Sequence, residues 1–198
     1  MKKYFWIPLF IVGMTFNLNV QSLRFSIGPT LAVPIGTISD YLKPGWGANF
    51  REEYFMTSNF SLGGTISLLK LSGKNSKTIS GNTTHTNELS DATAFNTAAA
   101  LRFYPTKKII TGIDIGGYIN RNSSSKRIDE TSSGSPVTYG MDGSNESDIY
   151  VSPLVGFNAN HFQFWVSYSW LPNGYGFTLF TSSKQNIQLI GFGINYKL

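Results

Sequence analysis

Four charged residues stand at positions from which their side chains would share one face of alternating segments. Arg51 and Glu53 are two residues apart, and Arg102 and Asp114 lie in two other segments of the same kind. Successive side chains of a β-strand point to opposite faces, so residues two apart project to the same side. Opposite charges removed from water are stable when they are paired and hydrogen-bonded. We expect a buried polar network with a structural role. The alternative, a network that plugs the interior or gates a narrow path through it, is less favoured.

Histidine offers little catalytic chemistry in this chain, which has two histidines and no cysteine. The lack of cysteine excludes disulfides, thiolate metal sites and a cysteine nucleophile. The residue two positions after His161 is Gln163, whereas a lipid-modifying hydrolase would need a serine beside the histidine. His85 has Ser90 and Asp91 nearby, but in a polar segment where such triples arise by chance. No catalytic residue, metal site or cofactor is therefore predicted.

The run from Asp142 to Asp148 has the oxygen-rich composition of a calcium-binding loop. It lacks the glycine required at the sixth position, and Pro153 stands where the glutamate of the twelfth position is needed. The alternative, a solvated loop, explains the composition better. We do not predict a calcium site.

These residues must be positioned by β-strands, because no segment after Leu23 keeps a helical period over three turns. Two-residue alternation of apolar and small or polar side chains dominates instead. Ile113 and Ile115, for example, alternate with Gly112, Asp114 and Gly116. The alternating segments, eight in all, are 24–33, 46–56, 60–71, 94–104, 109–119, 148–157, 162–171 and 187–198.

The connections between these segments alternate between short and long. The short ones are 57–59, 105–108 and 158–161, and the long ones are 34–45, 72–93, 120–147 and 172–186. The two longest are rich in Ser, Thr, Asn, Gly and charged residues, a composition that buries little apolar surface. We expect them to be exposed, mobile and sensitive to proteases.

The two faces of the strands distinguish a membrane barrel from a soluble one. Charged residues are only 14% of the chain, and the less apolar face of most strands carries Gly, Ala, Ser and Thr. Small side chains suit the interior of an eight-stranded barrel, so the large apolar face must point outward, which is stable only in lipid. The prediction is an all-β fold: a single antiparallel up-and-down transmembrane β-barrel of about eight strands. A soluble barrel is the weaker alternative.

The N-terminal segment has the composition of a secretory signal. Lys2 and Lys3 precede the apolar run 5–14, and Val20 and Ser22 suit a signal peptidase. We predict a signal peptide at 1–22 and a barrel domain at 23–198, in preference to an uncleaved anchor. Without those two lysines, 14 basic residues remain against 11 acidic ones, an excess too small to indicate nucleic acid as a partner.

Two stretches resemble a known family. Pro34, Gly36 and Ile38-Ser39-Asp40, followed by Gly45-Trp46-Gly47, are similar to the first loop and second strand of small outer-membrane β-barrels of the OmpA/OmpX-like group, PorT-like barrels included. The last strand resembles their C-terminal assembly signal, which here comprises Phe192, Ile194, Tyr196 and Leu198. Leu198 departs from the aromatic residue with which such signals usually end. The resemblance implies outer-membrane lipid and the barrel-insertion machinery as partners.

The function expected from these features is that of a non-enzymatic protein of the bacterial outer membrane. It would be structural, or it would bind a protein or surface ligand through the loops 72–93 and 120–147. Both termini would be periplasmic and the long loops extracellular, since the strand number is even. An accessory barrel subunit of a secretion or uptake complex is one alternative, and a lipid-modifying enzyme is another.

Overall fold

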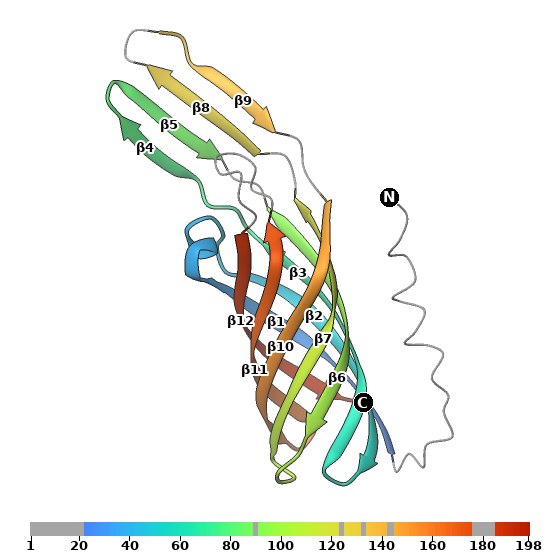
Figure 1. Cartoon of the computed structure of the whole chain (residues 1–198). Helices are drawn as coiled ribbons and strands as arrows, with labels where there is room; N and C mark the ends of the chain where they lie inside the picture. Colours follow the sequence, from blue (N-terminus) through green and yellow to red (C-terminus); the bar gives the residue numbers. More distant parts are fainter. Residues whose placement is uncertain (1–21, 89–90, 123–124, 132–133, 142–144, 176–184) are drawn as a thin grey trace.

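The computed structural model describes residues 22–88, 91–122, 125–131, 134–141, 145–175 and 185–198. In this part of the chain, eight long strands form a closed barrel: β1 (Ser22–Ile35), β2 (Gly45–Thr57), β3 (Phe60–Leu71), β6 (Ala92–Phe103), β7 (Ile109–Asn122), β10 (Asn145–Ala159), β11 (Phe162–Tyr175) and β12 (Gln185–Lys197). Each is antiparallel to its neighbours, and β1 pairs with β12 to close the sheet (Figure 1). The predicted eight-stranded up-and-down barrel is confirmed. The described residues include no helix long and apolar enough to cross a membrane.

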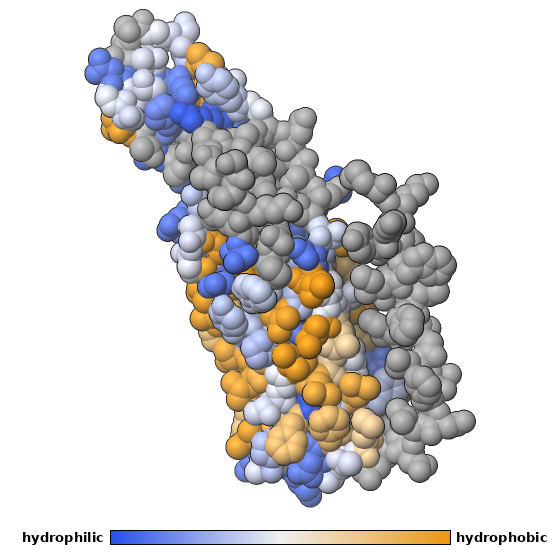
Figure 2. Space-filling view, in the orientation of Figure 1, coloured by the Kyte–Doolittle hydropathy of each residue, from blue (hydrophilic) through white to orange (hydrophobic). Residues whose placement is uncertain are grey.

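The alternation of the sequence becomes an apolar outside and a polar, small-residue inside. On β7, Ile115 and Ile119 are about half exposed, whereas Asp114 and Tyr118 are buried. The same alternation on the other strands covers the middle of the barrel wall with hydrophobic side chains, while hydrophilic residues lie beyond it (Figure 2). A wall of this kind is unfavourable in water and favourable in lipid.

The short connections all lie at one end of the barrel, together with the start of β1 and the end of β12 (Figure 1). Ser58 and Asn59 join β2 to β3, residues 104–108 join β6 to β7, and Asn160 and His161 join β10 to β11. Asn160 has a φ of 49°, a conformation that asparagine tolerates better than most residues. The opposite end carries all the long connections.

The prediction that 72–93 and 120–147 are loops is wrong for much of their length. They contain a second antiparallel sheet of four strands beyond the barrel, in the order β4 (Ser76–Ser80), β5 (Thr83–Glu88), β8 (Ser125–Thr131) and β9 (Val137–Met141). The central pairing, β5 with β8, joins the two connections to each other. Threonine and isoleucine favour extended backbone, and pairing between distant segments satisfies backbone groups that either segment alone would leave to water.

Both ends of the barrel interior are filled by apolar side chains. Residues 36–44 fold inward through the short 3-10 helix η2 (Gly36–Asp40), so that Ile38 and Leu42 are 1% exposed against the interior at the long-connection end. Phe55, Tyr104 and Ile110 pack together near the short turns. The polar residues of the interior therefore lie between two apolar layers.

Glu52 follows strict alternation and lies on the outer face of β2. Its pairing with Gly64 belongs to a continuous register, and the irregularity of this strand pair falls later, between Phe55 and Thr57. The hydroxyl of Tyr54 donates a hydrogen bond to the Glu52 carboxylate. The β2–β3 ladder therefore has no bulge at Glu52, and the charge lies on the outer face of the barrel.

Candidate functional site

The deepest ion pair of the interior joins two adjacent strands, β6 and β7. Nη2 of Arg102 lies 2.5 Å from Oδ1 of Asp114, and the two residues are 1% and 5% exposed. Nη1 of Arg102 also donates to the carbonyl oxygens of Leu101 and Ile113, at 3.0 and 3.1 Å. The guanidinium thus bonds the backbone of both strands as well as the carboxylate.

A second polar group lies nearer the short turns, around Glu53. The hydroxyl of Tyr104 donates to Oε2 of Glu53 over 2.6 Å, and Nη1 of Arg24 lies 3.8 Å from the same oxygen. The Arg24 guanidinium also stacks on the ring of Phe55, 4.4 Å from its centroid. Glu53 is therefore balanced by a cation at the rim of the barrel.

Arg51 is 3% exposed, and among the described residues no carboxylate lies within ion-pair distance of it. Its guanidinium lies 4.1 Å from the ring centroid of Trp165, and Nη1 donates a long bond of 3.4 Å to Oε1 of Gln163. Nε of Arg51 has no hydrogen-bond partner. The structure thus places Arg51, Glu53, Arg102 and Asp114 inside the barrel, as two ion-paired groups and a separate arginine.

A layer of amides beside Arg51 was not identified from the sequence. Nδ2 of Asn195 donates to Oδ1 of Asn49 over 2.7 Å, and Nδ2 of Asn49 donates to the Thr30 hydroxyl over 2.7 Å. Trp165 donates from its indole nitrogen to Oδ1 of Asn195 over 3.2 Å. The two-residue alternation could have identified this layer, because it places Asn49 on the same inward face of β2 as Arg51. Only charged residues were assigned to the interior polar network, so the uncharged amides were missed.

In the outer sheet, His85 has a partner that the sequence did not indicate. His85 on β5 faces Asp129 on β8, with Nδ1 2.7 Å from Oδ1, and Arg127 donates from Nε to the same oxygen over 2.5 Å. Asp91 does not join them, since it pairs with Lys70 at 3.2 Å, and Ser90 lies outside the described residues. The hydrogen bond from Arg127 lowers the pKa of Asp129, and the bond with His85 acts in the same direction.

The other residues considered for chemistry remain apart. His161 is exposed in a turn and stacks on Tyr196 with 5.9 Å between ring centroids. Residues 142–144 of the calcium-like run lie outside the described part of the chain, as does the predicted signal segment up to residue 21. No group of three His, Asp or Glu side chains placed to hold a metal occurs among the described residues.

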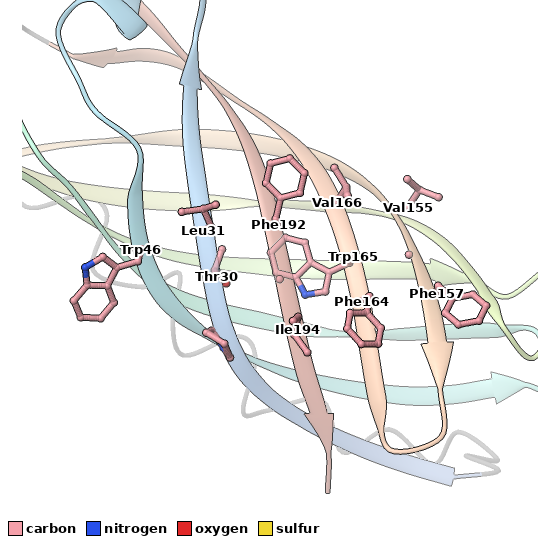
Figure 3. A pocket seen from close by; sticks show the side chains of 13 residues that line it. Thr30, Leu31, Trp46, Val155, Phe157, Phe164, Trp165, Val166, Phe192 and Ile194 are labelled. Atoms are coloured by element: carbon pink, nitrogen blue, oxygen red, sulfur yellow. The ribbon is translucent and has the colours of Figure 1, made fainter.

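Of the residues predicted as an assembly signal, Phe192, Ile194 and Tyr196 alternate along the outer face of β12, and Leu198 follows its end; the four are 43 to 72% exposed. A shallow apolar depression of about 720 Å³ lies on the same wall, across β1, β2, β10, β11 and β12 (Figure 3). Its lining includes Leu31, Trp46, Phe164, Phe192 and Ile194. Outward apolar side chains on five strands are what acyl chains of a bilayer would contact, so the depression belongs to the lipid-compatible wall.

A closed antiparallel barrel of eight strands with a lipid-compatible wall, short turns at one end and long connections at the other has the fold of the small outer-membrane β-barrels. Solved structures agree. The chain is similar to Ail, the attachment invasion locus protein of Yersinia pestis, with 12% identity, a TM-score of 0.52, and coverage of 89% of this chain and 97% of that chain. It is similar to Neisserial surface protein A, with 10% identity, a TM-score of 0.50, and the same coverage of both chains. No protein-family model and no curated protein sequence matches the chain.

Proposed function

We propose that this chain is a non-enzymatic protein of the bacterial outer membrane that holds a small β-sheet outside the cell as a binding surface for a protein partner. The observation that carries the proposal is the sheet β4-β5-β8-β9, which extends from the barrel end opposite both the short turns and the chain ends of the barrel (Figure 1). In outer-membrane barrels the short turns are periplasmic and the long connections extracellular. The sheet would then be the part of the chain farthest from the membrane.

The outer strands of this sheet provide the means of recognition in this proposal. Strands β4 and β9 each pair on one side only, which leaves backbone N–H and C=O groups along both edges. Exposed edges of this kind accept an added strand from a partner. Ile79 on β4 and Tyr139 on β9 are 72% and 53% exposed and offer apolar contacts beside the backbone bonds.

The side-chain-filled interior argues against a transport role. Apolar layers at both ends enclose the polar layer, and the cavity between them measures about 50 Å³. Eight strands leave a lumen just wide enough for side chains. The two similar structures are named as an attachment invasion protein and a surface protein, in keeping with the surface location proposed for this chain.

Labelling of single cysteines in intact cells tests the orientation, because the chain has no cysteine of its own and an introduced one is its single thiol. We expect Ile79→Cys to react with a membrane-impermeant maleimide, since the proposed location is outside the cell. Ser58→Cys, in the β2–β3 turn, should react only after the outer membrane is permeabilised. Equal reaction of both variants in detergent is the control. If Ser58→Cys alone reacted in intact cells, the short turns would be extracellular. The outer sheet would then be periplasmic, and the proposed binding surface would be wrong.

Blocking one sheet edge tests recognition by strand addition. Ser80 and Thr83 flank the two-residue turn Gly81-Asn82, so alternation of the ladder directs the Lys77 N–H away from β5. Lys77→Pro should therefore abolish crosslinks formed by a photoreactive residue at position 79 in cells of the native strain, without breaking the β4–β5 ladder. Lys77→Ala keeps the N–H and should keep the crosslinks. Equal loss in both variants would assign binding to the lysine side chain instead.

A further inference from the structure

The interior of the barrel carries more positive than negative charge at its polar layer. Three arginines, Arg24, Arg51 and Arg102, face two carboxylates, Glu53 and Asp114, among the described residues of this region. Arg24 pairs with Glu53 and Arg102 pairs with Asp114. Arg51 is left over, and an arginine does not lose its proton in a protein. An unpaired buried charge is strongly unfavourable unless a counterion or several hydrogen bonds compensate it.

A cavity of about 50 Å³ lies beside this unpaired guanidinium. Its wall includes Arg51, Thr30, Thr65, Ser67 and Asn96. The Nε of Arg51, the hydroxyl of Thr65 and the amide oxygen of Asn96 are buried without any hydrogen-bond partner. Three unsatisfied polar groups around one small space require an occupant, because each one costs the desolvation energy of a lost hydrogen bond.

The side chains around the cavity can direct hydrogen-bond donors into it. Thr30 accepts from Asn49 and Ser67 accepts from Asn96, so both hydroxyl hydrogens are free to point elsewhere. The Asn96 amide can also turn over, in which case its NH₂ replaces the Ser67 hydroxyl as the donor facing the cavity. The carboxylate of Asp114 also reaches the wall, but Arg102 neutralises it.

We propose that this cavity binds a small monovalent anion of halide size, held by Nε of Arg51 and by hydroxyl donors of Thr30, Thr65 and Ser67. The anion balances the third arginine and satisfies donors that the chain leaves without partners. The small volume of the cavity favours a halide over a larger organic anion. The site lies within the barrel and does not depend on what the outer sheet binds.

The test compares the full chain refolded in detergent with sodium bromide or with sodium gluconate at equal ionic strength. Because a ligand that binds only the folded state shifts the equilibrium by mass action, bromide at about ten times its Kd should lower the unfolding equilibrium constant about tenfold. Arg51→Gln should lose this dependence on bromide. Arg24→Gln removes a lumen arginine that already has a partner, and it should keep the dependence.

Crystals grown from protein refolded in bromide give a readout that needs no variant. We expect an anomalous scattering peak beside Nε of Arg51. A peak-free cavity filled by water, or equal stability of the unmodified chain in bromide and gluconate, would overturn the proposal. A bromide effect of the same size in Arg51→Gln would overturn it too, because the anion would then act elsewhere.

Discussion

Substitution of Gly28 by alanine is expected to prevent most of the chain from reaching the closed barrel. Gly28 lies on β1 where this strand meets β12, the pairing that closes the sheet. A Cβ at this position would lie 1.8 Å from the carbonyl oxygen of Ile194, which is backbone and cannot turn aside. The two strands would have to separate at the closing seam, at a cost of about 3 kcal/mol or more.

The measurement is the fraction of folded protein in detergent, followed by its heat-modifiable migration on a gel and by urea titration. Gly117→Ala on β7 is the matched control, because its Cβ would meet only the Asp148 carbonyl oxygen at 3.8 Å, an ordinary contact. We expect this variant to fold as the unmodified chain does. A Gly28→Ala protein with unchanged yield and urea midpoint would show that the β1–β12 seam tolerates a wider spacing than the structure has.

Asp114→Ala should be the most damaging change in the polar layer. It leaves the guanidinium of Arg102, 1% exposed, without its carboxylate, and loss of one partner of a buried pair costs about 3–5 kcal/mol. The double variant Arg102→Met with Asp114→Ala removes both charges, so we expect it to regain most of the lost stability. Urea titration of the folded barrel in detergent measures both changes.

The pair Lys70–Asp91 supplies the control for this experiment. Its ammonium and carboxylate are 3.2 Å apart, but both side chains are about half exposed at the end of β3. Asp91→Asn should cost less than about 1 kcal/mol, because water screens an exposed pair. Equal costs for Asp114→Ala and Asp91→Asn would mean that water reaches the Arg102–Asp114 pair and that the interior is not sealed.

Local pattern determined most of the barrel. The alternation of Ile113 and Ile115 with Gly112 and Asp114 identified β7 and its inward face before any contact was known. The segment 60–71 was predicted with the bounds that β3 has. Most other strand ends lie a few residues beyond the predicted ones, whereas β6 and β12 end one residue earlier than predicted. Strand bounds are the weakest part of such a prediction, because apolar alternation fades where a strand leaves the hydrophobic layer.

Local pattern also placed the four charges in the interior but did not determine their partners. Asp114 joins Arg102, and not Arg51, because β6 and β7 are neighbours whereas β2 lies beyond β3. Which strands are neighbours follows from sheet closure. The unpaired state of Arg51, and the small cavity beside it, could be recognised only once that closure was known.

The outer sheet shows the limit of the sequence most clearly. Residues 72–93 and 120–147 read as loops, because neither segment buries an apolar face and each alone would leave its backbone to water. In the folded chain the barrel pairs β6 with β7 and brings the two connections together at one end, where β5 and β8 pair. The sequence by itself thus determined the barrel strands, their inward faces and the lipid-compatible wall, through the two-residue period of side chains. The tertiary structure decided the ion pairs, the cavity and the outer sheet, because each depends on contacts between segments far apart in the chain.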